Sequence, residues 1–125
     1  MKAKTTERGW GGHFICAHRC QFRRNTLIEF GDVKIVVSTV GLMQSGLHGT
    51  GEGFDPIGAF NRYYETMAFH SMVGDTRYHD ADVSRQVGFE SEWSIDKIDA
   101  DDLANIMHDN VVKEISEKLE KGITP

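Results

Sequence analysis

The chain has 125 residues, of which 39% are hydrophobic and 26% are charged, and its formal net charge is −5. These values exclude a disordered chain and predict one ordinary domain with an apolar core. No run approaches the roughly 20 apolar residues of a membrane span. The polar residues 1–8 are followed by no apolar signal segment. We therefore expect a cytoplasmic protein with no membrane contact.

The N-terminal part is expected to begin with a loose leader over residues 1–10, which ends at the breaker Trp10-Gly11-Gly12. Residues 13–22 combine aromatic and small apolar side chains without Pro or Gly, which favours a strand. Residues 23–25, Arg-Arg-Asn, are predicted to turn the chain. Alternate side chains of the strand share one face, namely Phe14, Cys16, His18, Cys20 and Phe22.

Residues 26–40 predict a β-hairpin. Gly31-Asp32 separates two apolar runs, and Gly at the first loop position suits a type II′ turn. This register brings an opposite-charge pair together on one face and branched and aromatic pairs on the other. The predicted cross-strand pairs are Phe30 with Val33, Glu29 with Lys34, Ile28 with Ile35 and Leu27 with Val36.

The middle of the chain predicts a loop and a second hairpin. Residues 41–58 contain six glycines and one proline, which indicates a long flexible loop. Strand character returns at 61–72, and Gly74-Asp75 repeats the turn dipeptide of the first hairpin. A two-residue turn there would place His70 opposite His79, Phe69 opposite Asp80, Ala68 opposite Ala81 and Met72 opposite Arg77. A further short strand is expected over 85–89.

Residues 100–121 predict a long amphipathic helix. Asp99 is the expected cap, and carboxylates in the first turn complement the helix dipole. Gly122 is expected just past the C-terminal end. The helix is expected to bury one stripe against the sheet: Leu103, Ile106, Met107, Val111, Ile115 and Leu119. Together these elements predict the α+β class, with an antiparallel β-meander of four to six strands and one C-terminal helix packed on a face.

Two sets of side chains have the chemistry of metal ligands. Cys16, His18 and Cys20 are zinc-type ligands on one strand face, but we favour the interpretation that they are two core cysteines and one hydrogen-bonded core histidine. His70 and His79, as cross-strand neighbours with Asp80 or Asp82 nearby, would suit a divalent metal in a hydrolytic site. The alternative is a polar, exposed sheet face. No cofactor is otherwise predicted, and a divalent metal remains an open alternative.

Three surfaces are candidates for partner binding. The glycine-rich loop, with His48 and Glu52, could order on a partner. Arg23 and Arg24 lie near aromatic side chains and could clamp single-stranded nucleic acid, but the acidic chain disfavours this, and solubilising arginines explain them.

The third candidate surface is the acidic stretch 90–102, which holds six carboxylates and one lysine. Glu90, Glu92 and the apolar Trp93 could face a basic protein partner. The alternative is a solvated connection with Trp93 in the core. The stretch belongs to an acidic half of the chain, because residues 63–125 hold fourteen Asp/Glu against six Lys/Arg, whereas residues 1–62 hold five against eight.

Four segments resemble small uncharacterised proteins of phages and mobile elements: 9–27, 36–41, 63–70 and 80–83. The resemblance carries no catalytic motif and assigns no residue roles. It implies a phage accessory protein in the host cytoplasm, for which binding and inhibiting a host factor is a common role.

Three functions follow as hypotheses. The first is a non-enzymatic module that binds a host or phage protein through residues 41–58 and the Trp93 region. The second is a metal-dependent hydrolase that uses His70 and His79. The third is a structural or assembly subunit that forms homo-oligomers.

Overall fold

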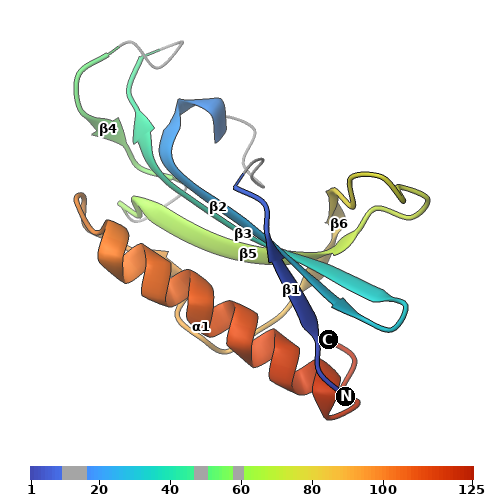
Figure 1. The fold of residues 1–125 in the computed structure, drawn as a ribbon. Coiled ribbons are helices and arrows are strands. Elements are labelled where there is room, and N and C mark those ends of the chain that lie inside the picture. The colour runs from blue at the N-terminus through green and yellow to red at the C-terminus, as the bar shows by residue number, and fades with distance from the viewer. Residues whose placement is uncertain (10–16, 47–50, 58–60) are drawn as a thin grey trace.

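The computed structural model describes residues 1–9, 17–46, 51–57 and 61–125. Within these ranges the chain forms one antiparallel sheet of seven strands and one long helix, α1, which packs on the sheet (Figure 1). The α+β prediction is therefore confirmed. The strand order is β1-β2-β3-β5-β6, with the two-residue strands β4 and β7 attached to β3 and β5. The elements are β1 (Lys4–Glu7), the 3-10 helix η1 (Ala17–Arg19), β2 (Cys20–Phe30), β3 (Val33–Gln44), β4 (Phe54–Asp55), β5 (Tyr64–Ser71), β6 (Ala81–Val87), β7 (Ser94–Ile95) and α1 (Asp101–Glu120).

The β2–β3 hairpin has the predicted register. Gly31 has a φ of 58°, which the first position of a type II′ turn requires. The pairing continues far beyond the turn, to Cys20 opposite Met43. β3 therefore lies between β2 and β5 and forms the centre of the sheet. All four predicted pairs are present: Phe30–Val33, Glu29–Lys34, Ile28–Ile35 and Leu27–Val36.

The N-terminal predictions are largely wrong. The expected loose leader contains β1, which pairs with β2 from Lys4 opposite Glu29 to Glu7 opposite Thr26. The expected turn at 23–25 lies inside β2. Its Arg24 and Asn25 are held by side-chain bonds, because Asn25 accepts from Arg8 and Arg24 donates to Glu7. Side-chain pairing across the edge of the sheet therefore overrides the turn propensity of these polar residues.

The two middle predictions also need correction. The expected loop over 41–58 is shorter, because β3 continues to Gln44 and β4 pairs back onto it. In the second hairpin, Ser71 rather than His70 is paired near the turn, and its partner is Ala81. Residues 72–80 form a wide loop, because the Asp75 carboxylate accepts hydrogen bonds from the N–H groups of Arg77, Tyr78 and Asp80. These bonds replace the tight two-residue turn.

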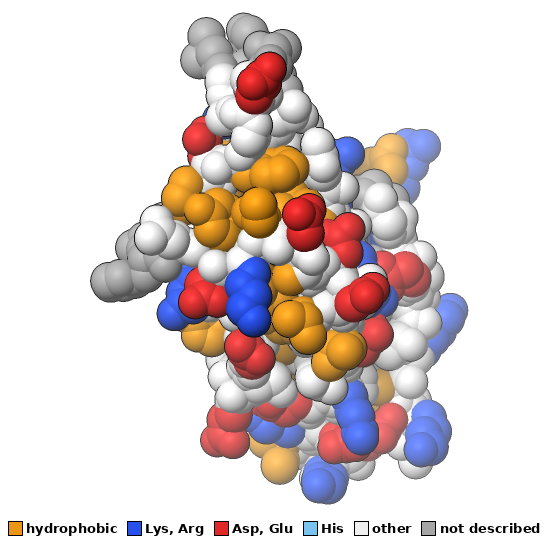
Figure 2. All heavy atoms as spheres, turned by 90° about the vertical axis from the view of Figure 1, so that its left-hand side faces the viewer, with side chains coloured by type: hydrophobic (Ala, Val, Ile, Leu, Met, Phe, Trp, Pro, Cys, Tyr) orange, Lys and Arg blue, Asp and Glu red, His pale blue; other side chains and the backbone are white. Residues whose placement is uncertain are grey.

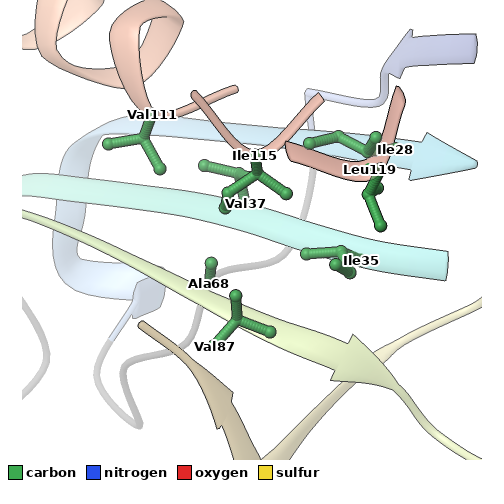
Figure 3. Packing of buried hydrophobic residues seen from close by; sticks show 8 residues of the cluster. All are labelled: Ile28, Ile35, Val37, Ala68, Val87, Val111, Ile115 and Leu119. Atoms are coloured by element: carbon green, nitrogen blue, oxygen red, sulfur yellow. The ribbon is translucent and has the colours of Figure 1, made fainter. Parts of the chain in front are cut away.

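Helix α1 packs lengthwise over one face of the sheet (Figure 1). The main contact is an apolar cluster in which three helix side chains fit against β2, β3, β5 and β6 (Figure 3). The C-terminal end has the predicted glycine, and the N–H groups of Gly122 and Ile123 bond to the carbonyls of Leu119 and Lys118 in a Schellman motif. The cluster consists of Ile28, Ile35, Val37, Ala68, Val87, Val111, Ile115 and Leu119.

A buried polar chain lies beside this cluster, between the sheet and α1. The Thr26 hydroxyl donates to a Glu7 carboxylate oxygen at 2.7 Å. It therefore accepts from His108 Nε2, also at 2.7 Å. His108 Nδ1 is then the acceptor of the Thr39 hydroxyl, and Thr39 accepts from Thr66. Both ring nitrogens of His108 and the hydroxyls of Thr26, Thr39 and Thr66 therefore all have hydrogen-bond partners, as burial requires.

Candidate functional site

Two helix residues that were expected in the core are on the surface. Leu103 and Ile106 are 49% and 56% exposed, while Ala104 and His108 take the places facing the sheet. Trp93 and Ile98, in the segment that leads into α1, are 52% and 50% exposed. We call Trp93, Ile98, Leu103 and Ile106 the docking face. Leu103 and Ile106 also line one common hollow, and exposed apolar side chains that are contiguous in space are typical of an interaction surface.

Figure 2 views the molecule from the side where α1 begins. Hydrophobic side chains gather there in patches, with both acidic and basic side chains between and around them. Between Glu90 and Asp109 the sequence holds seven carboxylates and one lysine. This side of the molecule therefore combines apolar contact area with negative charge.

A hollow of about 190 Å³ lies between α1 and the 92–97 segment. Leu103, Ile106 and the buried Met107 line it on the helix side, and Ile95 lines it on the strand side. The ionic side chains that complete its wall are balanced in charge: Arg62 and Lys97 against Glu92 and Asp96. The hollow therefore combines four apolar side chains with polar and charged ones, a mixture that is common at interfaces.

A second hollow, of about 340 Å³, lies on the other side of the same segment. Trp93 lines it together with Met67, Val87, Gly88 and Phe89. Strand β5 pairs with β7 up to Glu65 and with β6 from Ala68 onward. The hollow lies at the stretch of β5 between these two pairings. The segment carrying Trp93 thus separates two apolar depressions.

The excess negative charge is concentrated at the start of α1. Asp99, Asp101 and Asp102 line one hollow of about 330 Å³, together with Gln21 and Leu42. Asp101 is held by Tyr64, whose hydroxyl donates to its Oδ1 at 2.7 Å and accepts from the N–H of Ala100 at 2.9 Å. Burial and the bond to Asp101 raise the pKa of the Tyr64 phenol, so it stays protonated and able to donate. Tyr64 therefore fixes the position at which the helix begins, where the expected Asp99 side-chain cap is not formed.

Glu114 fixes the other end of the Trp93 segment. Its carboxylate accepts from the N–H groups of Glu90 and Ser91 at 2.7 and 2.8 Å, from the Ser91 hydroxyl at 2.6 Å and from Lys118 at 3.1 Å. Burial opposes ionisation, but these hydrogen bonds outweigh it and lower the pKa of Glu114 to about 2. The segment that carries Trp93 and Ile98 is therefore held at both ends by hydrogen bonds, to Glu114 of α1 at one end and to Tyr64 at the other.

The structure places the predicted metal ligands differently. His70 is paired with Ile35 of β3, and His79 lies in the 72–80 loop with a φ of 49°, so the predicted His70–His79 strand pair is wrong. Both imidazoles nevertheless line one hollow of about 340 Å³. Asp80 and Asp82 are not among its lining residues, and Asp82 bonds Ser84 and Arg85. Among the described residues, no group of three or more His, Cys, Asp or Glu could hold a metal ion.

The cysteine set is also dispersed. Cys20 is buried against Val40, Met43 and Ile57, whereas His18 is exposed on η1. The shared strand face predicted for these two residues is therefore wrong, and Cys16 lies outside the described residues. A 3-10 helix changes the direction of successive side chains, so the period of two does not apply before Cys20.

The remaining predicted partner residues do not form one surface. Arg23 is exposed in the middle of β2, while Arg24 bridges Glu7 and Asp109 at 3.0 and 2.9 Å. Arg24 is thus a structural link between β1, β2 and α1. Glu52 is exposed and its carbonyl accepts from the Ser45 hydroxyl, and His48 lies outside the described residues. Glu90, Glu92 and Trp93 are exposed on the segment that leads into α1, and Glu92 also lines the 190 Å³ hollow.

Comparison of the chain with protein-family models, with curated proteins and with solved structures finds no match. In the part of the chain that the structure describes, no helix combines the length and the apolar character needed to cross a membrane.

The sequence contained a signal for the exposed helix residues. At 100° per residue, Ile106 lies about 140° around the helix from Val111, whereas Ile115 lies only about 40° from it. Leu103 lies at about 80° from Val111, on the edge away from Ile115. Measuring the angle of each apolar residue around the helix, rather than counting intervals of three and four, therefore singles out Ile106, whereas Leu103 lies no farther from Val111 than the buried Leu119 does on the opposite edge.

Proposed function

We propose that the protein is a non-enzymatic binding module that docks a protein partner on Trp93, Ile98, Leu103 and Ile106. The observation that carries this proposal is the exposure of Leu103 and Ile106 on a helix whose other apolar residues are buried or, in the case of Val112, partly buried. Fully burying an apolar side chain of this size contributes about 1.5–3 kcal/mol, so a partner that covered these two half-exposed side chains would gain roughly half of that from each.

The rigidity of the surface also supports docking. Glu114 and Tyr64 hold the two ends of the 90–101 segment through hydrogen bonds between segments far apart in the chain. A face held in its binding conformation loses little conformational entropy when a partner binds. The resemblance to small phage proteins implies a host or phage protein as the partner, in the host cytoplasm.

A pull-down with matched variants tests this proposal. Wild type, the double variant Leu103→Asp/Ile106→Asp and the control Val83→Asp are immobilised and exposed to the same cell lysate. Val83 is an exposed apolar residue on β6 and is not part of the docking face, so it controls for the loss of a surface hydrophobe. Far-ultraviolet circular dichroism checks that all three are folded.

We expect at least one protein to be retained by wild type and by Val83→Asp and lost from the double variant. Retention that is equal in all three folded proteins, or no retention by any of them, overturns the proposal. Sedimentation of the purified protein tests the assembly-subunit alternative. If wild type is oligomeric and the double variant is monomeric, the partner is a second copy of this chain.

A further inference from the structure

We infer that the docking face selects a basic amphipathic segment of its partner, with one large apolar side chain in the hollow between α1 and residues 92–97 and cationic side chains beside the start of α1. This inference rests on the proposed function and specifies the chemistry of the partner.

The size of the hollow fits the apolar anchor. Its volume is about 190 Å³. An apolar cavity of about 150 Å³ accommodates benzene, so one leucine, isoleucine or phenylalanine side chain fits. The contact surfaces offered by Leu103, Ile106 and Ile95 are aliphatic, which favours an apolar occupant over a polar one.

The arrangement of charges indicates where the cations lie. Around the hollow the charges cancel, since Arg62 and Lys97 balance Glu92 and Asp96. Asp101 and Asp102 directly precede Leu103 in the first turn of α1, and together with Asp99 they line a separate hollow that, among the described residues, no basic side chain lines. A helix N-terminus carries a partial charge of roughly +0.5, which three carboxylates outweigh. The partner segment is therefore expected to carry Lys or Arg on the side of its anchor that faces the first turn of α1.

Trp93 adds a second feature that favours cations. Trp93 is half exposed and lines the second hollow, the one of about 340 Å³ that Met67 and Phe89 also line. An Arg or Lys side chain over an indole face gains about 0.5–1 kcal/mol at an exposed site. The same charges disfavour a second copy of this chain as the partner. In a symmetric dimer the carboxylates of Asp99, Asp101 and Asp102 would face the same carboxylates of the other copy and repel them.

The test uses the full chain and three synthetic peptides of one length and one helical pattern. The first peptide combines Leu with Lys, the second combines Leu with Glu, and the third replaces every Leu of the first by Ala. Affinity is measured by titration calorimetry, and the contact surface is mapped from the backbone amide shifts of 92–106. The charge variant is Asp99→Asn/Asp102→Asn, in which Asn tolerates the left-handed φ of 54° at position 99. Its matched control is Glu117→Gln, an exposed carboxylate farther along α1.

We expect the Leu/Lys peptide to bind and to shift amides within 92–106. Its affinity should fall at least tenfold in Leu103→Asp/Ile106→Asp and about three- to tenfold in Asp99→Asn/Asp102→Asn, and should stay within twofold in Glu117→Gln and Val83→Asp. The Leu/Glu and Ala/Lys peptides should bind at least tenfold more weakly.

Other outcomes separate the two proposals. Equal binding of the Leu/Glu peptide at the same amides overturns the charge selection and leaves the docking proposal standing. If the Ala/Lys peptide binds equally well, or if no variant weakens binding, the inference is overturned. Either result would mean that cationic peptides bind nonspecifically to an acidic protein. If no peptide binds although the pull-down succeeds, the inference alone fails, and if both experiments fail the docking face has no function in binding.

Discussion

Glu114 and Ser91 are joined by two hydrogen bonds that hold the Trp93 segment on α1. Glu114 Oε1 accepts from the Ser91 N–H at 2.8 Å and from the Ser91 hydroxyl at 2.6 Å, while Oε2 accepts from the N–H of Glu90. Charge-assisted bonds of this kind are about twice as strong as neutral ones. Because β6 ends at Val87 and β7 begins at Ser94, these bonds anchor the connection between two sheet strands.

Glu114→Gln is expected to loosen that connection. The amide keeps the shape of the side chain but loses the charge, so the free energy of unfolding should fall by about 1–2 kcal/mol. Amide hydrogen exchange at Glu90 and Ser91 should accelerate at least tenfold. Urea unfolding and exchange measured by nuclear magnetic resonance check both effects. Glu117→Gln, one turn farther along α1, is the control and should change stability by less than about 0.5 kcal/mol. Unchanged exchange at Ser91 in Glu114→Gln would contradict this account.

His108 makes the stability of the protein depend on pH. Burial, helped by the nearby positive charge of Arg24, lowers the pKa of His108 from 6.5 to about 4. Above pH 6.5 the imidazole is neutral in both the folded and the unfolded chain, and its contribution is fully present. As the pH falls below 6.5, only the unfolded chain takes up the proton, so stability is lost until about pH 4. Between pH 7 and pH 5 the loss should be about 2 kcal/mol.

The variant His108→Gln isolates this effect. The amide cannot titrate, so the difference in unfolding free energy between pH 7 and pH 5 should shrink by about 2 kcal/mol relative to wild type. Glu114 adds little in this interval, because its contribution is lost as the pH falls from 4.5 toward its folded pKa of about 2. Parallel slopes for wild type and His108→Gln would refute the assignment.

Thr39 is the residue on which the polar chain depends most. Its hydroxyl donates to His108 Nδ1 at 2.7 Å and accepts from Thr66 at 2.6 Å. Thr39→Val keeps the shape of the side chain but leaves His108 Nδ1 and the Thr66 hydroxyl without this partner. The free energy of unfolding should therefore fall by about 1–3 kcal/mol. Thr5→Val, on the exposed edge strand β1, should be nearly neutral. Nitrogen shifts of His108 should show the proton on Nε2 in wild type, because Thr26 uses its own proton on Glu7.

The two Gly-Asp turns show how much of the fold could be predicted. At Gly31-Asp32 the turn and the branched apolar pairs on either side favour the same register, and the prediction is correct at every pair. At Gly74-Asp75 the same dipeptide is overridden, because burial of Ala68 and Val87 sets the pairing of β5 with β6 and the Asp75 carboxylate organises a longer loop. A local signal fixes register only where the distant contacts agree with it.

The candidate surface was predicted in part for a similar reason. Trp93 among carboxylates is visible in the sequence as an unusual pattern. The exposure of Leu103 depends on where α1 sits on the sheet, and the polar chain turns His108 rather than Ile106 inward. A histidine in a core position follows from three threonines on three different strands, which no local pattern reveals.

Gly41 links the centre of the sheet to the docking face. A Cβ at this position would overlap the Tyr64 ring, with Cε2 at 2.8 Å and Cγ at 2.9 Å. Tyr64 is fully buried and its hydroxyl positions Asp101 and Ala100, so the ring cannot move without disturbing the start of α1. Gly41→Ala should therefore lower the unfolding free energy by about 1–3 kcal/mol or more.

The matched substitution is Gly88→Ala, since a Cβ there meets nothing within 4 Å. It should change stability by less than about 0.5 kcal/mol. Urea unfolding of the two variants and of Tyr64→Phe separates steric from polar effects. Tyr64→Phe keeps the ring and loses the hydrogen bonds to Asp101 and Ala100, so its amide shifts should change at 99–103 and not along β3. If Gly41→Ala is as stable as Gly88→Ala, the contact between β3 and Tyr64 does not constrain where the helix begins, and the rigidity ascribed to the docking face would depend on Glu114 alone.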